Sequence, residues 1–570
     1  MSEPAFTISR TELHSKIREA ARSVAQGQPE GQDFLDRLAE VGLADEVLLP
    51  STRIHTDGEI ETAVVLYRSF LAQRSRPGDP RGTADAVPLV LRNMSIAMLQ
   101  LGNLREAKHF HIQALAAGFQ DASGVSAWAD YLMQHGYQEE AEREIETRLL
   151  TAPESAALRS LRFTLLEFGA IDPGRHLQDH LDWWAGQPPV PAMSGPPRPA
   201  NGRPLRLGVI VRDLRTPSSF NRTFDAFPHL HGDAFDVSLV SIRSGSVLRG
   251  ALSSLSVHDL EADDPDRFAR GLADLGFDML LDLVSHGNSN VFAALRHRPA
   301  PVQLGWISSG ISAGVPWIDY MLTDGLISPV GSERHYSETL VRIPAPAFAV
   351  PGLREAPVPV EPPVFRKGHV TFGVFNRISK ITTESMEAWA EILHRVPTAH
   401  LRIQNSNVTL PGVTRRLLRF FVERGIAAER LHFAGYVPEA AYLRDVGETD
   451  IALEPFPQTG GVTAFDALWM GVPTLIHVVD DRPCCRAALL PAGAAGIGAL
   501  VSRRVEDYID NAVFLANRAE FLQELRFSMR GRLSAAVFTR PEALGDSLRR
   551  ALTAIWEQAC SGRKAPIWIE

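Results

Sequence analysis

The chain is poor in cysteine. It has three in 570 residues, Cys484, Cys485 and Cys560, and two of these are adjacent. Adjacent cysteines rarely pair with each other, and three cysteines cannot build a disulfide framework. The sequence therefore argues against a disulfide-stapled secreted scaffold and favours a reducing compartment.

Long apolar runs are lacking as well. The longest candidate, LLPAGAAGIGALV (489–501), is interrupted by Pro491 and several glycines, and it is shorter than the roughly 20 residues that span a bilayer. The first residues, MSEPAFTISRTELHSK, are polar and lack the apolar core of a signal peptide. We therefore expect a cytoplasmic protein without a membrane span.

An excess of positive charge is also missing. The 58 Lys and Arg are outnumbered by 67 Asp and Glu, for a formal net charge of −9, so we expect no nucleic-acid-coating surface. The Gly-x₄-Gly-Lys-Ser/Thr and Gly-x-Gly-x-x-Gly patterns are absent, which argues against a P-loop or dinucleotide enzyme. No Cys/His cluster has zinc-ligand spacing, and we expect no metal and no other cofactor.

The N-terminal third contains a helical repeat. Apolar residues recur at three- and four-residue intervals. Gly102 and Gly136 are 34 residues apart, as are Ala107 and Ala141. A helix, a glycine-containing turn and a second helix with a small residue at this period are typical of tetratricopeptide repeats. We predict a TPR-like α-helical domain over residues 1–185, with a plain helical bundle as the alternative.

Two other segments suggest further repeat units. Residues 58–73 resemble the second helix of an earlier unit, followed by a surface insertion at 74–85. Gly169 lies another 33 residues beyond Gly136 and suggests a third, degenerate unit. Stacked helix pairs leave a concave groove, which predicts a protein or peptide partner.

Residues 186–204 are rich in proline and have no periodicity, which indicates a linker or an extended strap against a domain surface. From residue 205 the pattern changes to strands alternating with helices, which predicts a parallel, doubly wound sheet. A second series of this kind begins near residue 368.

We accordingly predict two α/β lobes in series. The first spans 205–355, the second spans 356–540, and a closing helix occupies 541–570. The carboxyl ends of the strands of such lobes form the edge where ligands bind.

The most informative stretch is EPFPQTGGVTAFDALWMGVP, in which paired glycines open a helix. Gly460 and Gly461 would let a ligand approach the backbone closely. Val462 and Thr463 would supply N–H groups of the first turn to an anion, and Asp466 could accept bonds from ribose hydroxyls. The alternative is a tight strand-to-helix turn without a ligand.

A second element is FNRISK, in which a strand ends at Asn376 and Arg377 and Lys380 follow on the loop. A lysine beside two phosphates can neutralise a departing nucleoside diphosphate. The alternative is a solvated surface lysine.

Two elements of the first lobe are also candidates. His286, in DLVSHGNSN, follows a predicted strand and could bind a sugar hydroxyl or the acceptor, although a buried or capping histidine is equally compatible. The Gly- and Ser-containing segment 298–324 suggests a loop that lets a chain or ligand pass closely, with an ordinary packed connection as the alternative.

Four segments together resemble the O-GlcNAc transferase and SPINDLY family of glycosyltransferases. They are DLVSHGN, RPAPVQLGWISSG…WIDYMLTD, FNRISKI and LEPFPQTGGVTAFDALWMGVP. The repeats and the tail IWEQACSGRKAP extend the resemblance over nearly the whole chain, as in a divergent, bacterial-type member. The resemblance implies an α/β GT-B fold with two Rossmann-like lobes. It also implies an inverting, metal-independent transfer of a sugar from a nucleotide donor to Ser or Thr hydroxyls of a protein held by the repeats.

The resemblance also implies roles for single residues. Lys380 and Thr463 would contact the diphosphate, Asp466 the ribose, and the segment around Val437 and Tyr442 the base. Asn376, Arg377 and the Gly460–Val462 backbone would complete the nucleotide-sugar site, and Asp213 or His286 would assist the acceptor hydroxyl.

The chain also departs from the family pattern. Gly461 replaces the first residue of a His-Thr-Thr motif, Pro217 and Ser218 stand near an expected histidine, and Glu439 and Tyr442 align with a lysine and a histidine beside the base. A donor other than UDP-GlcNAc is therefore compatible: UDP-glucose, GDP-fucose or a CMP-linked nonulosonic acid, with a specific acceptor such as flagellin. A non-catalytic scaffold with a degenerate sugar-nucleotide site is the alternative function, and a homo-oligomer is compatible with either.

Overall fold

The computed structural model describes most of the chain. The described residues are 9–28, 30–40, 44–74, 86–119, 126–165, 173–212, 214, 219–243, 245, 250–306, 311–344, 346, 348 and 356–569. The chain divides into two compact units. The first consists of Met1–His135 with Asn407–Phe420, and the second of Gly136–Ser406 with Phe421–Glu570.

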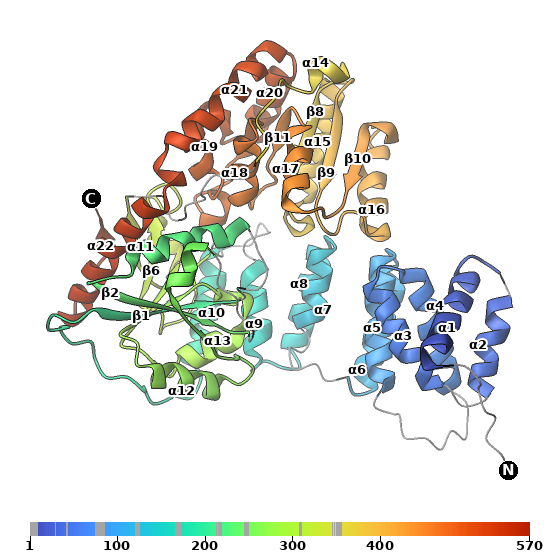
Figure 1. The fold of residues 1–570 in the computed structure, drawn as a ribbon, viewed down its shortest axis with the longest axis horizontal. Coiled ribbons are helices and arrows are strands. Elements are labelled where there is room, and N and C mark those ends of the chain that lie inside the picture. Colours follow the sequence, from blue (N-terminus) through green and yellow to red (C-terminus); the bar gives the residue numbers. More distant parts are fainter. Residues whose placement is uncertain are drawn as a thin grey trace. The chain divides into compact units, whose positions relative to one another are not determined.

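The N-terminal part is helical, as predicted, and its elements are labelled in Figure 1. The helices are α1 (Arg10–Ala25), α2 (Glu30–Glu40), α3 (Ala44–Thr56), α4 (Ile60–Arg74), α5 (Ala86–Gln100), α6 (Leu104–Ala116), α7 (Ser126–Gln134), α8 (Gln138–Leu149), α9 (Ala156–Thr164) and α10 (Pro173–Ala185).

The 34-residue period corresponds to a repeated helix–turn–helix. Gly102 follows α5 with φ of +78°, and Gly136 follows α7 with φ of +79°. This left-handed conformation strains any residue that has a Cβ. Ala107 on α6 and Ala141 on α8 are fully buried, and the small side chain of Ala107 suits the close contact between α5 and α6. The helical repeat is confirmed, whereas Gly169 and the insertion at 75–85 lie outside the described residues.

The first α/β lobe is built on a parallel sheet of eight strands in the order β14-β7-β6-β5-β4-β1-β2-β3. The strands are β1 (Leu205–Val211), β2 (Phe235–Ser241), β3 (Ser256–Asp259), β4 (Met279–Asp282), β5 (Val302–Trp306), β6 (Tyr320–Asp324), β7 (Thr339–Ile343) and β14 (Ile567–Trp568). The helices of this lobe are α11 (Phe227–Leu230), α12 (Pro265–Leu275) and α13 (Ser289–Leu295). Phe268 and Leu272 of α12 join Ile210 and Leu280 in one buried apolar cluster.

The second lobe is built on a parallel sheet of six strands in the order β10-β9-β8-β11-β12-β13. The strands are β8 (Thr371–Val374), β9 (His400–Gln404), β10 (Leu431–Ala434), β11 (Ile451–Leu453), β12 (Thr474–His477) and β13 (Val501–Ser502). The helices are α14 (Val364–Lys367), α15 (Thr383–Arg395), α16 (Pro411–Val422), α17 (Glu439–Gly447), α18 (Val462–Trp469), α19 (Leu489–Ala495), α20 (Val505–Ala516) and α21 (Ala519–Ala535). Two parallel-sheet lobes of this kind constitute the predicted GT-B fold.

The C-terminal segment returns to the first lobe. Helix α22 (Pro541–Cys560) contacts α11 and β7. A Cβ at Gly545 would lie 2.7 Å from Cβ of His229, so the glycine permits this close approach. The chain then adds β14 parallel to β7. The closing helix was expected from the sequence, but this terminal strand was not.

The proline-rich segment is an extended strap. The backbone N–H groups of Met193 and Ser194 donate to the carbonyls of His297 and Arg298, at 2.7 and 3.0 Å. These bonds attach the strap to the residues that follow α13. Because the segment is held by backbone bonds to another part of the chain, it shows neither a helical nor a strand-like pattern of apolar residues.

The segment 298–324 was expected to be a loop, and the structure corrects this prediction. Its two ends are the central strands β5 and β6, every residue of which is buried. A strand buried on both faces shows no alternation of polar and apolar residues. The two strands therefore had no distinctive pattern, and the Gly and Ser residues between them led to the prediction of a loop.

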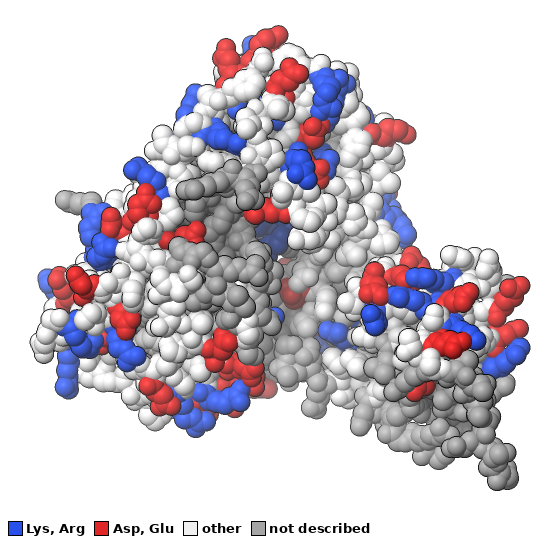
Figure 2. Space-filling model, viewed as in Figure 1, with Lys and Arg blue, Asp and Glu red and all other residues white. Residues whose placement is uncertain are grey.

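Acidic and basic side chains alternate over the face shown in Figure 2, without a large area of one sign. This mixture agrees with the modest net charge of −9. Among the described residues, no helix has the length and apolar character needed to cross a membrane.

Candidate active site

A buried carboxylate organises the loop after β11. Glu454 is 3% exposed and accepts hydrogen bonds from Nδ2 of Asn376, at 3.0 Å, and from the backbone N–H of Gly460. Burial raises the pKa of Glu454, while these bonds and the positive charge of Lys380 act in the opposite direction. The carboxylate therefore ties the end of β8 to the glycine pair.

Gly460 is required by this polar cluster. A Cβ at Gly460 would lie 2.2 Å from Oγ1 of Thr463, 2.8 Å from Nδ2 of Asn376 and 2.9 Å from Oε2 of Glu454. The space beside this glycine is thus filled by polar groups of the protein itself. The paired glycines were expected to clear room for a ligand. At Gly460, however, the neighbouring side chains of the protein are themselves sufficient to require a glycine.

Gly461 is the N-cap of α18, and no side chain caps this helix. The first intrahelical bond joins the N–H of Phe465 to the carbonyl of Gly461, so the preceding N–H groups have no partner within the helix. Gly461, Val462 and Thr463 are all half-buried. A Cβ at Gly461 would lie 2.8 Å from Cζ of Phe348, so this side of the helix mouth is closed by an aromatic ring.

Lys380 ends the short 3₁₀ helix η6 (Ile378–Lys380) and is half-buried. Its Nζ donates to the carbonyl of Thr459 at 2.8 Å. The N–H of Thr459 donates in turn to the carbonyl of Cys484 at 3.0 Å. The structure therefore brings the lysine loop and the glycine loop together, as the sequence predicted, and Thr459 is the contact that the sequence did not identify.

The other predicted binding residues lie around the same edge. Asp466 is 3% exposed on the buried side of α18, and Val437 is half-buried after β10. Tyr442 is half-buried on α17, with its ring edge-on to Phe375 at 6.0 Å between centroids. Arg377 is exposed to solvent.

His286 has a different environment. It is 8% exposed, and its ring packs against Phe163, His180 and Phe292 with centroids 4.9, 5.8 and 4.9 Å away. Its Nε2 lies 3.2 Å from the carbonyl oxygen of Ser312. Burial lowers the pKa of His286 to about 4, so the ring is neutral at pH 7. Of the two interpretations from sequence, the buried histidine is the one observed, and Asp213 lies outside the described residues.

Ser312 connects this histidine to a buried acid that the sequence did not reveal. Oγ of Ser312 donates to Glu338 at 2.7 Å, as does the N–H of Ala313 at 2.5 Å. Burial raises the pKa of Glu338, and these bonds oppose the rise. The two predicted elements of the first lobe, DLVSHGN and the segment after β5, therefore meet in one polar network.

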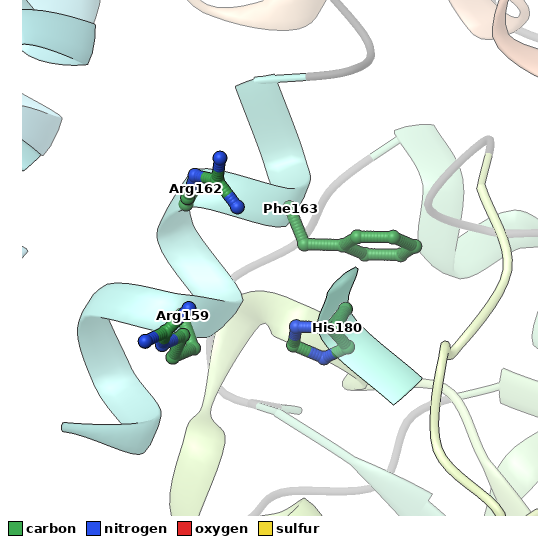
Figure 3. A pocket seen from close by; sticks show the side chains of 4 residues that line it. All are labelled: Arg159, Arg162, Phe163 and His180. Atoms are coloured by element: carbon green, nitrogen blue, oxygen red, sulfur yellow. The ribbon is translucent and has the colours of Figure 1, made fainter. Parts of the chain in front are cut away.

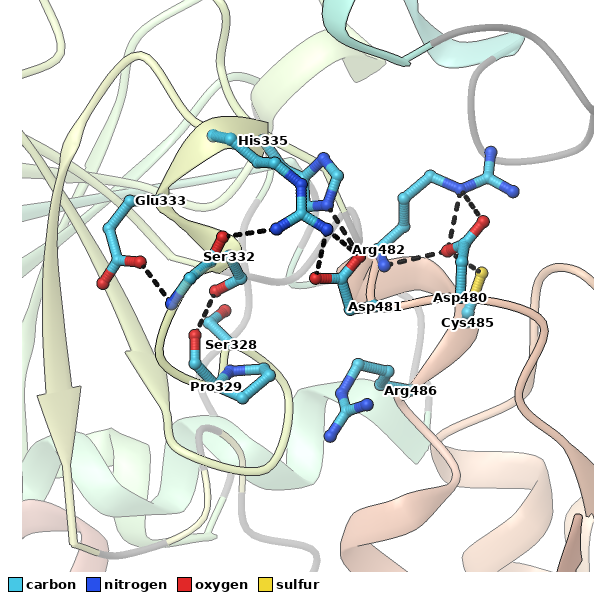
Figure 4. A network of polar contacts seen from close by, with 12 residues as sticks. Ser328, Pro329, Ser332, Glu333, His335, Asp480, Asp481, Arg482, Cys485 and Arg486 are labelled. Atoms are coloured by element: carbon cyan, nitrogen blue, oxygen red, sulfur yellow. Dashed lines mark hydrogen bonds and ion pairs between the residues drawn. The ribbon is translucent and has the colours of Figure 1, made fainter. Parts of the chain in front are cut away.

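The two lobes are also linked directly (Figure 4). Asp481 of the second lobe accepts bonds from Arg334, at 2.7 Å, and from Nε2 of His335, at 3.0 Å, both in the first lobe. Nε of Arg486 donates to the carbonyl of Leu326 at 2.6 Å. The neighbouring Asp480 pairs with Arg482 at 2.8 Å. Both members of the acidic pair Asp480–Asp481 therefore contact basic side chains.

Among the described residues, no group of three or more His, Cys, Asp and Glu side chains is arranged to hold a metal ion. The site as a whole combines an uncapped helix mouth, a lysine and a buried carboxylate at the carboxyl edge of a parallel sheet. Those features are of the kind that bind anions on two-lobed α/β folds.

The chain is similar to known glycosyltransferases. The model of glycosyl transferase family 41 matches residues 265–351 and 365–541, so this part of the chain is similar to that family. The matched residues include the edge that bears Lys380 and the glycine pair.

Individual relatives agree with this assignment. The chain is 27% identical over 372 residues to the rice protein "Probable UDP-N-acetylglucosamine--peptide N-acetylglucosaminyltransferase SPINDLY", an alignment that covers 63% of this chain and 40% of the rice protein. It is 25% identical to the similarly named SEC protein of Arabidopsis thaliana, over 66% of this chain and 40% of that protein. The chain thus spans about two fifths of the length of these curated relatives.

A solved structure covers nearly the whole chain. A mutant O-GlcNAc transferase of Thermobaculum terrenum superimposes with a TM-score of 0.76 and 26% identity, over 91% of this chain and 98% of that one. The helical region followed by two Rossmann-like lobes is therefore shared, and the GT-B prediction is confirmed.

Proposed function

We propose that the chain transfers a sugar from a nucleotide donor to a polypeptide, and that the donor diphosphate binds at the mouth of α18. The observation that carries the proposal is the bond between Lys380 and Thr459, because it fixes an ammonium group beside the uncapped N–H groups of Val462 and Thr463. Positive charge and free donors at one point match a diphosphate.

The proposed reaction is an inverting displacement without a metal. A Ser or Thr hydroxyl of the acceptor attacks the anomeric carbon and forms the new glycosidic bond, while the bond to the nucleoside diphosphate breaks and its electron pair leaves with the phosphate oxygen. Negative charge grows on that oxygen in the transition state. Lys380 and the N–H groups of α18 stabilise it from fixed positions, which is where preorganised donors contribute most.

The remaining residues have supporting roles in the proposal. Asp466 accepts from the ribose, and the backbone near Val437 with the ring of Tyr442 borders the base. Asn376 and Arg377 flank the lysine loop. His286, enclosed by aromatic rings, positions the Ser312 carbonyl and does not transfer a proton.

We propose Asp213, which the sequence places after β1, as the general base that takes the proton from the attacking Ser or Thr hydroxyl. The donor is proposed to be a UDP-sugar, because the relatives are named as probable UDP-N-acetylglucosamine--peptide N-acetylglucosaminyltransferases. Phe348 stands against Gly461 at the helix mouth. Because Gly461 departs from the His-Thr-Thr pattern of the family that the sequence resembles, UDP-glucose, GDP-fucose and CMP-linked sugars remain candidate donors.

The test is a thermal-shift and transfer experiment across UDP-, GDP- and CMP-sugars. A preferred nucleotide should raise the melting temperature with increasing concentration, since it binds only the folded chain, and the matching radiolabelled sugar should appear on lysate proteins. Stabilisation by a nucleotide without any transfer would instead favour a non-catalytic scaffold.

A further inference from the structure

Helix α8 of the repeat region contacts the lysine loop of the proposed nucleotide site. Nε2 of Gln138, the first residue of α8, donates to the carbonyl oxygen of Ser379 at 2.9 Å. Ser379 is 7% exposed and directly precedes Lys380 in η6. Two segments that lie 241 positions apart in the sequence therefore meet one residue away from the lysine.

The bond from Gln138 caps the short helix that ends at Lys380. Within η6 the carbonyl of Ile378 accepts from the N–H of Ile381 at 3.0 Å. The next carbonyl along the chain, that of Ser379, accepts from the side chain of Gln138. The last carbonyls of a helix need partners from outside it, and α8 supplies one of them here.

The lysine loop is also held by the glycine loop of the same lobe. Nζ of Lys380 donates to the carbonyl of Thr459 at 2.8 Å, and Oγ1 of Thr382 donates to the carbonyl of Phe456 at 2.8 Å. Two separate segments, the glycine loop and α8, therefore fix the loop that carries the lysine.

Helix α8 is itself anchored through its neighbour α9. Arg162 on α9 pairs with Glu146 on α8 at 2.5 Å. The adjacent Phe163 stacks on His180 with ring centroids 4.6 Å apart (Figure 3), and its ring packs against His286 of the first lobe at 4.9 Å. The helix pair α8–α9 thus contacts the first lobe through α9 and the second lobe through α8.

We propose that Gln138 is a positioning residue for the sugar transfer: by binding the carbonyl of Ser379 it keeps Nζ of Lys380 beside the mouth of α18. The inference rests on the proposed function, in which Lys380 stabilises the leaving diphosphate. A preorganised donor stabilises developing charge from a fixed position, and a small displacement of such a group lowers the rate. Helix α8 therefore contributes to the donor site as well as to the repeats that are assigned to the acceptor.

The experiment measures initial rates of the full chain with the preferred donor. Gln138→Leu removes the hydrogen-bond donor without adding charge. It should lower kcat by about five- to tenfold, the factor that one neutral hydrogen bond is worth. KM for the donor should stay at the wild-type value, because the charge on the leaving oxygen develops only in the transition state.

A double-variant comparison separates positioning from a purely structural role. If Gln138 acts through Lys380, Gln138→Leu should lower kcat in the wild-type background and have no further effect in a Lys380→Ala background. A general loosening of the fold would lower the rate by the same factor in both backgrounds.

Two further variants serve as controls. Gln134→Leu makes the same change on α7, at an exposed side chain whose Nε2 bonds Asp130 of the same helix at 2.7 Å, and it should keep wild-type kcat. Gln138→Glu has nearly the size of the native residue and cannot donate, while its carboxylate is favourable in the first turn of a helix. It should lower kcat as Gln138→Leu does, and it replaces that variant if the leucine fails to fold.

Hydrogen exchange reports the contact without any substrate. The N–H groups of Lys380 and Ile381 close the turn of η6. Both should exchange faster in Gln138→Leu than in the wild type, and both should exchange at the wild-type rate in Gln134→Leu.

The outcomes distinguish the inference from the proposed function. Wild-type kcat in Gln138→Leu, or effects of Gln138→Leu and Lys380→Ala that multiply, overturns the inference while the proposed function stands. Unchanged exchange in η6 overturns the inference whether or not the protein transfers sugar. Faster exchange in a protein that transfers no sugar keeps the hold of Gln138 on the lysine loop and rejects the proposed function.

Discussion

Nζ of Lys380 lies 2.8 Å from the carbonyl oxygen of Thr459, one residue before the glycine pair that opens α18. Two loops separated by about eighty positions in the sequence are thereby held in one place. The account of a sugar-nucleotide site depends on this contact, because a lysine without it would be an ordinary surface cation.

The first prediction concerns Lys380→Ala. The variant should lower kcat by about 100-fold, since a fixed charged donor to the leaving group contributes on this order. The melting temperature should change little, because the side chain is half-buried and its bond to the Thr459 carbonyl contributes only about 1 kcal/mol. Initial-rate kinetics with the preferred donor measure the effect. Lys564→Ala removes the same charge from a side chain that is 65% exposed and should keep wild-type kcat.

The second prediction concerns Gly460→Ala. The new methyl group would meet Oγ1 of Thr463 at 2.2 Å, so the polar cluster must shift, and the free energy of unfolding should fall by about 1–3 kcal/mol. Urea denaturation followed by circular dichroism measures it.

Gly493→Ala is the matched control for this change. Gly493 lies within α19, and a Cβ there meets nothing within 4 Å. The same added methyl group should therefore stabilise the chain by about 0.5–1 kcal/mol through helix propensity. Equal effects of the two alanines would contradict the packing described around Gly460.

The third prediction is a pH dependence that comes from His286. Its pKa is lowered from 6.5 to about 4 in the folded chain, so folding favours the neutral ring. The corresponding stability is fully present above pH 6.5 and is lost as the pH falls toward 4, to a total of about 3 kcal/mol. His286→Gln should flatten the fall of unfolding free energy over this interval.

The measurement is the slope of unfolding free energy against pH, which separates titration from any loss of packing in the variant. His109→Gln, at an exposed position on α6, should retain the wild-type slope. A His286→Gln protein with the full wild-type slope between pH 6.5 and 4 would show that the ring titrates normally.

The fourth prediction concerns the bridge between the lobes. Asp481→Asn removes the charge that Arg334 and His335 contact. Because Asp481 is partly exposed, the free energy of unfolding should change by less than about 1 kcal/mol, while hydrogen exchange should increase in η5 (Ser332–His335). Asp510→Asn breaks an exposed pair with Arg395 inside the second lobe, and exchange in η5 should then stay at the wild-type rate.

Much of the fold was predictable because its signals are local. The buried run LRLGVIV coincides with β1, and the switch from helical to alternating elements after residue 204 marks the first lobe. The 34-residue spacing of Gly102 and Gly136 predicted two turns that both have positive φ. Each strand and each turn is encoded within a few neighbouring residues, and the 34-residue period repeats such a local signal.

The rest depends on contacts between distant segments. Strand β14 has only two residues and forms because β7 offers a free edge, which no local pattern reveals. His286 looked available for catalysis, but Phe163 and His180 come from helices more than a hundred residues earlier and enclose it. Glu454 was part of the conspicuous stretch, yet its role follows only from its bond to Asn376, which lies after β8.

The most direct test of the account is the transfer of radiolabelled sugar to polypeptide by wild type and Lys380→Ala, side by side with calorimetric binding of the free nucleoside diphosphate. The account predicts that the wild type labels protein and binds the diphosphate, and that the variant loses about 100-fold in kcat and binds the diphosphate more weakly. A variant that labels protein at the wild-type rate would contradict the assignment of Lys380 and α18 as the site where the leaving group is stabilised.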